Sequence, residues 1–246
     1  MEVVTLREID INENLIRRIV RAIDKAVADD VPQYLRENYK ETNNAIPQLR
    51  GDFINDNLRL QVVGENIELI AFQRYAWEGR LIVDRVNKIT YTVTTQQTLK
   101  LIPKKQRSKP HFLQTLLHNE NDCYEASIEQ LELLEPIIFD EDIFQDDYTS
   151  IVGNLIDPAE GYRHYVIAYE AKKSELIDVQ LEFLDKNFKL IEGVCLNEYI
   201  KPDFARITSP DLTIEVYSDN KDEEAKSLIS IKSGLRPKLR EIEDQA

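Results

Sequence analysis

Strict alternation of apolar and polar residues over positions 177–183 constrains the fold more than any other feature of the sequence. The apolar members are Ile177, Val179, Leu181 and Phe183, with Asp178, Gln180 and Glu182 between them. Because successive side chains of a β-strand point to opposite faces, the four apolar residues would share one face. The apolar run 165–169 precedes them across the polar segment 172–174. We therefore expect an antiparallel hairpin with one face on a core.

Helical spacing dominates the first part of the chain. Apolar residues recur at intervals of three and four over 12–28, which predicts an amphipathic helix. Further helices are expected over 31–39, 48–60, 95–102, 108–118 and 141–155. Further strands are expected over 67–75, 80–86, 89–94, 188–191 and 212–217. The sequence thus predicts an α+β protein, with N-terminal helices followed by antiparallel β-hairpins and interspersed short helices.

The length of 246 residues suggests one large domain or two small ones. We predict a helical and hairpin region over 1-125, an α+β domain over 126-217 and a charged peripheral tail over 218-246. No run of about 18 apolar residues is present, which argues against a membrane span. The two cysteines match no metal or redox spacing, so a reduced cytoplasmic protein is the default expectation.

The net charge of −14 is concentrated in one segment. Residues 119–162 contain 13 acidic residues and no lysine or arginine. The partner-binding candidates in it are Glu129, Glu132, Glu135, Asp140, Asp142, Asp146 and Asp147. Carboxylates on such elements recur every ~5–7 Å, close to the phosphate spacing of DNA. We hypothesise a non-enzymatic intracellular protein that uses an acidic surface to bind a basic partner, such as a nucleic-acid-handling enzyme. A solvated acidic face is the simpler interpretation.

Residues 74–109 have the opposite character, with nine basic residues, two acidic residues and interleaved aromatic residues. Basic side chains neutralise phosphates and aromatic rings stack on bases, so single-stranded nucleic-acid binding is an alternative hypothesis. Its candidate residues are Arg74, Trp77, Arg80, Arg85, Lys104, Lys105 and Arg107. An internal alternative is that this basic segment lies against the acidic one.

One pattern indicates enzymatic chemistry. Glu170-Ala171-Lys172 closes the apolar run 165–169, and Asp157 lies 13 residues before Glu170. This arrangement resembles the motif of the restriction-endonuclease-like nuclease fold. The resemblance implies that Asp157 and Glu170 hold a divalent metal ion such as magnesium, and that Lys172 helps to place the attacking water. It covers only about 16 residues, and Pro158 follows the aspartate instead of preceding it. Otherwise Glu170 and Lys172 are polar residues at a hairpin turn, and no cofactor is expected.

Overall fold

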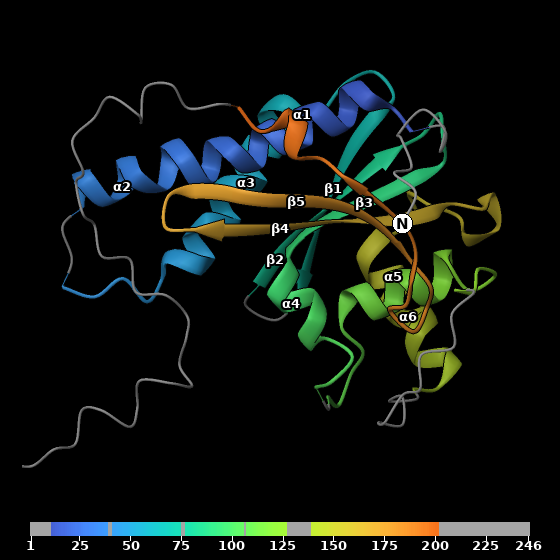
Figure 1. The fold of residues 1–246 in the computed structure, drawn as a ribbon. Helices are drawn as coiled ribbons and strands as arrows, with labels where there is room; N and C mark the ends of the chain where they lie inside the picture. The colour runs from blue at the N-terminus through green and yellow to red at the C-terminus, as the bar shows by residue number, and fades with distance from the viewer. Residues whose placement is uncertain (1–10, 39–40, 75–76, 106, 127–138, 202–246) are drawn as a thin grey trace, which may run out of the picture.

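The computed structural model describes residues 11–38, 41–74, 77–105, 107–126 and 139–201. A six-stranded sheet forms the centre, with helices on both of its faces (Figure 1). The strands are β1 Ile67–Arg74, β2 Trp77–Asp84, β3 Ile89–Thr95, β4 Arg163–Lys172, β5 Glu175–Leu184 and β6 Leu190–Cys195. They lie side by side in chain order, and every neighbouring pair is antiparallel except β3 and β4.

The helices divide into an N-terminal and a central group. They are α1 Glu13–Lys25, α2 Val31–Glu37, α3 Ile46–Gln61, α4 Gln96–Leu101, α5 Phe112–Glu120 and α6 Glu141–Val152. A π-helical segment, Ala26–Asp30, joins α1 to α2, and two 3₁₀ turns cover Pro158–Glu160 and Asn197–Tyr199. The predicted α+β class is therefore confirmed. Among the described helices, none is long and apolar enough to cross a membrane.

The sheet separates two apolar cores. On one face, Ile19 of α1 is buried in the same cluster as Tyr91 and Leu181 of the sheet. On the opposite face, Leu116 of α5 is buried with Val166 of β4. Alternation along each strand supplies both cores, because neighbouring residues point to opposite faces. The central strands are consequently buried on both sides.

Parallel pairing of β3 with β4 bears on the predicted domain division. The register runs from Ile89 beside Arg163 to Thr95 beside Tyr169, so strands from before and after position 125 share one sheet. Parallel neighbours require a long crossover connection, which hydrophobic periodicity does not reveal. The boundary between 1-125 and 126-217 thus falls within one continuous sheet. The predicted strand 212–217 and tail 218-246 lie outside the described residues.

A β-bulge changes one position of the alternating segment. The register between β4 and β5 shifts at residues 170 and 171. Leu176 therefore enters the core, and Ile177 is 42% exposed. The prediction was wrong for Ile177, since a bulge adds an unpaired residue to one strand and breaks its two-residue period. Val179, Leu181 and Phe183 are buried, as predicted.

Candidate functional site

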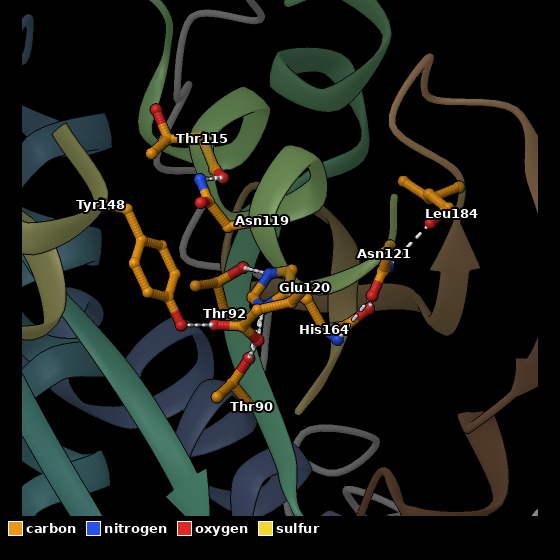
Figure 2. Close-up of polar contacts among 9 residues, drawn as sticks. All are labelled: Thr90, Thr92, Thr115, Asn119, Glu120, Asn121, Tyr148, His164 and Leu184. Carbon is orange, nitrogen blue, oxygen red and sulfur yellow. Dashed lines mark hydrogen bonds and ion pairs between the residues drawn. The ribbon is translucent and has the colours of Figure 1, made fainter. Parts of the chain in front are cut away.

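The most polar part of the interior lies where α5 and α6 meet the centre of the sheet (Figure 2). Thr90 and Thr92 lie two residues apart on β3 and so point to the same face. The parallel register places His164 of β4 beside Thr90. Glu120, at the end of α5, and Tyr148 of α6 complete the group. All five side chains are buried.

Hydrogen bonds connect these side chains in one chain (Figure 2). The Tyr148 hydroxyl donates to Glu120 Oε1 at 3.0 Å, and the Thr90 hydroxyl donates to Glu120 Oε2. Thr90 Oγ1 also lies 2.7 Å from His164 Nδ1, and Thr92 Oγ1 lies 2.9 Å from Nε2. With Glu120 ionised, Nδ1–H donates to Thr90 and Nε2 accepts from Thr92. Protonation of Glu120 on Oε2 would allow the bonds through Thr90, His164 and Thr92 to reverse direction, while Tyr148 would still donate to Oε1.

Burial acts on the two titratable groups in opposite directions. It raises the pKa of Glu120 to about 7, although the hydrogen bonds from Thr90 and Tyr148 lower it. It lowers the pKa of His164 to about 3, so the imidazole is neutral near pH 7. Glu120 Oε2 and His164 Nδ1 lie 3.9 Å apart, but they do not form an ion pair at neutral pH because the imidazole carries no charge. Such opposed shifts are typical of acid–base pairs in enzymes.

A substrate cannot reach this pair in the described structure. The His164 side chain is 0% exposed and that of Glu120 is 2% exposed. Asn121 hydrogen-bonds to the neighbouring backbone (Figure 2). Its side-chain nitrogen donates to the carbonyls of His164 and Leu184 at 2.9 and 2.8 Å, and its side-chain oxygen accepts from the His164 N–H. We therefore assign the network a structural role. It joins α5 and α6 to the parallel pair of strands and satisfies buried polar groups.

The acidic candidates divide into three groups. Glu129, Glu132 and Glu135 lie outside the described residues. Asp140, Asp142 and Asp146 are exposed in or just before α6. Asp147 instead pairs with Arg74 of β1 and accepts a hydrogen bond from Thr115 of α5. Asp147 thus anchors α6 to the rest of the fold and has little capacity for a partner.

Several basic candidates are also used inside the molecule. Besides its pair with Asp147, Arg74 donates to the Pro110 carbonyl at 2.7 Å. Arg85 donates to the Glu68 carboxylate and to the Leu155 carbonyl, each at 2.7 Å. The hydrogen bond from Arg85 lowers the pKa of Glu68. These contacts support the internal alternative in part, because two of them join the basic segment to the acidic one.

The remaining candidates of the basic segment differ in how many contacts they make within the protein. Arg107 donates to the Ile102 carbonyl at 2.9 Å, and Arg80 lies 3.5 Å from the Glu78 carboxylate. Lys104 and Lys105 are exposed. Trp77 is 46% exposed and stacks on Phe112 with ring centroids 5.2 Å apart.

The candidate nuclease residues lie at opposite ends of β4. Glu170 and Lys172 are near its end, whereas Asp157 precedes its start. Arg85 and Lys88, from the β2–β3 connection, hold the segment around Asp157 by donating to carbonyls on either side of it, at 2.7 and 3.0 Å. At about 3.3 Å per residue, the strand up to Glu170 spans roughly 23 Å. The two carboxylates therefore do not share one metal ion.

A cavity that was not predicted lies between α4 and β5. Its volume is about 340 Å³. Along β5 its lining changes from polar at Asp178, Gln180 and Glu182 to apolar at Leu184, which gives it a polar and an apolar end. Gln96, Leu99, Lys100 and Phe188 also line it. Asp178, Gln180 and Glu182 are the polar positions of the alternating segment 177–183. Alternation alone predicts that such residues face solvent. In the described part of the chain, no cluster of three or more His, Cys, Asp or Glu side chains is placed to hold a metal ion.

Comparison with known proteins gives one match. A model of the DUF5986 family, described as a family of unknown function, matches residues 8–245. No curated protein and no solved structure matches the chain.

Proposed function

This chain belongs to the DUF5986 family of unknown function, and we propose that it is a non-enzymatic protein that binds a basic protein partner through α6. The observation that carries the proposal is the set of exposed carboxylates of Asp140, Asp142 and Asp146. Asp142 and Asp146 are four residues apart in a helix and so project from the same side. Among the described residues, no Lys or Arg nitrogen lies within 4.0 Å of these three carboxylates.

Anchoring of α6 supports its use as a recognition surface. Its inner side chains, Phe144, Tyr148 and Ile151, are buried. The ring of His118 stacks on Phe144 at 4.0 Å, while Asp147 pairs with β1. A helix fixed in this way displays its carboxylates at a constant spacing and loses little conformational freedom on binding. Complementary charge would both accelerate the encounter with a basic partner and select that partner.

Charge reversal on matched helices tests the proposal. The test variant carries Asp142→Lys and Asp146→Lys, and the control carries Asp52→Lys and Asp56→Lys. The control pair is also exposed and four residues apart, but it lies on α3. Proteins captured from native lysate should include a basic partner that wild type and control retain and the α6 variant loses. Equal capture by all three proteins would contradict the proposal.

The Trp77 surface favours a second candidate function, the binding of single-stranded nucleic acid. The Trp77 residue is 46% exposed and its indole ring stacks on Phe112, as a stacking platform requires. Lys104 and Lys105, later in the same basic segment 74–109, are exposed. Because Trp77 is the single tryptophan, oligothymidylate should quench its fluorescence, with an affinity that falls as salt is raised. Unchanged fluorescence together with no mobility shift would exclude this function.

A further inference from the structure

The cavity between α4 and β5 contains two opposite charges that do not pair with each other. Glu182 lines it from β5 and Lys100 lines it from α4. Lys100 is close enough to oppose the rise in the Glu182 pKa that burial causes. Their nitrogen and oxygen atoms are nevertheless more than 4.0 Å apart, and neither side chain is hydrogen-bonded to another described residue. Both charged groups thus remain available to a ligand.

Asp178 arranges the polar end of this cavity. Its carboxylate accepts from the amide nitrogens of Gln180, Asn197 and Gln96, at 2.8, 2.7 and 2.5 Å. These bonds account for the lowered pKa of Asp178, although burial opposes it. Since Gln96 and Gln180 donate through nitrogen, their amide oxygens remain acceptors. Together with Glu182, they make this end rich in acceptors, which suits an ammonium group.

Phe188 supplies the apolar end in an unusual backbone conformation. Its φ angle is 63°, in the left-handed region that is unfavourable for a bulky residue. The Asp185 carboxylate holds this turn by accepting from two of its backbone N–H groups, at 2.8 and 2.9 Å. Leu99 and Leu184 line the cavity with it. A position that glycine or asparagine would occupy more easily therefore holds an aromatic ring against the cavity.

We propose that this cavity binds a small zwitterion of the α-amino acid class with an apolar side chain. The ammonium group would lie at Glu182 and the glutamine oxygens, the carboxylate at Lys100, and the side chain against Phe188. A simple organic cation would pair with Glu182 alone and leave the exposed Lys100 to water, and a simple anion would pair with Lys100 alone, whereas a zwitterion pairs with both. The volume of about 340 Å³ is at the small end of ligand pockets and suits one amino acid. The proposal is independent of the acidic surface of α6.

Three related compounds test which charges of the ligand contribute to binding in the cavity. The full chain is titrated by calorimetry with L-phenylalanine, with L-phenylalaninamide, which lacks the carboxylate, and with 3-phenylpropanoate, which lacks the ammonium group. L-Phenylalanine should bind at least about tenfold more tightly than either analogue, as expected from the loss of one charge-assisted hydrogen bond. Equal binding of the three compounds, or no binding of L-phenylalanine at millimolar concentration, would overturn the proposal.

Two variants assign each charge to its residue. Glu182→Gln should weaken L-phenylalanine and its amide at least about tenfold but leave 3-phenylpropanoate unchanged. Lys100→Gln should weaken L-phenylalanine and 3-phenylpropanoate but leave the amide unchanged. Lys104→Gln is the control, since Lys104 is exposed outside the cavity and should alter none of them. Circular dichroism is used to check that each variant is folded. Binding unchanged in both cavity variants would place the ligand elsewhere and contradict the assignment.

Discussion

Replacing Glu120 by glutamine should stabilise the protein above neutral pH and have little effect in mild acid. Glutamine keeps the oxygen that accepts from Tyr148, and its amide nitrogen can donate to Thr90 as a protonated carboxyl would. The variant therefore resembles wild type with Glu120 permanently neutral. The free energies of unfolding of the two proteins should therefore differ only at pH values where the wild-type carboxyl is ionised in the unfolded or the folded state.

The size of the effect follows from the pKa of Glu120. The pKa is about 7 in the folded state, against 4.5 for an ordinary glutamate. At ~1.4 kcal/mol per pKa unit, ionised Glu120 lowers the free energy of unfolding by about 3 kcal/mol. The stability that wild type has with Glu120 neutral is fully present below pH 4.5. It is lost as the pH rises from 4.5 to about 7, and it stays lost above that. The unfolded chain ionises first, which sets the sign.

His164 contributes in the opposite sense. Its pKa falls from 6.5 to about 3 on folding, so its contribution is present above pH 6.5 and is lost as the pH falls toward 3. Between pH 4.5 and 6.5 the two slopes therefore cancel in wild type. In Glu120→Gln only the histidine slope remains, and stability should rise up to pH 6.5 and then level off.

Urea denaturation at about pH 5 and about pH 8, followed by circular dichroism, measures this difference. Glu175→Gln, which removes an exposed carboxyl from β5, corrects for the loss of one negative charge. Glu120→Gln should be about 3 kcal/mol more stable than wild type at the higher pH and no more than about 1 kcal/mol more stable at the lower one. A difference of the same size at both pH values would refute the reasoning, because it would not arise from ionisation of Glu120.

Three further substitutions probe the packing and the network. A Cβ on Gly79 would lie 2.4 Å from the Phe72 ring, so Gly79→Ala should cost about 1–3 kcal/mol in urea denaturation. In Gly51→Ala the added Cβ meets no atom within 4 Å, and this helix variant should be as stable as wild type or up to about 1 kcal/mol more so. Tyr148→Phe removes a donor to Glu120, so its cost of about 1–2 kcal/mol should be larger at alkaline than at acidic pH. An equal cost at both pH values would contradict the described hydrogen bond.

Local patterns predicted the elements better than their boundaries. The apolar spacing of 12–28 became α1, and Val179, Leu181 and Phe183 face a core. The helix expected to start at Ser108 begins at Phe112 instead. His111 caps it, because its Nδ1 accepts from a backbone N–H of the first turn and its own N–H donates to a glutamine side chain three residues later. Histidine is not among the preferred capping residues, so composition gave no signal.

The polar interior could not be predicted from the order of residues along the chain. Thr90 and Thr92 alternate with apolar neighbours, which is also the pattern of a solvent-facing strand surface. They are buried because the parallel register brings His164 beside them and α5 brings Glu120 above them. Contacts between residues 30 to 74 positions apart decide this outcome. A one-dimensional pattern shows which residue types are available but not which of them meet.

The charged residues of the basic and acidic segments have two different roles in the folded protein: some pair with each other inside the molecule, and others are exposed to solvent. Arg74 and Asp147 come from the basic and the acidic segment, and their pairing at low exposure fixes α6 in place. Salt screens such a partly buried pair only weakly. Asp142 and Asp146, on the same helix, are exposed, and salt screens their attraction for a partner strongly. Part of the unusual charge pattern therefore belongs to the stability of the fold, and only the exposed remainder is available for recognition.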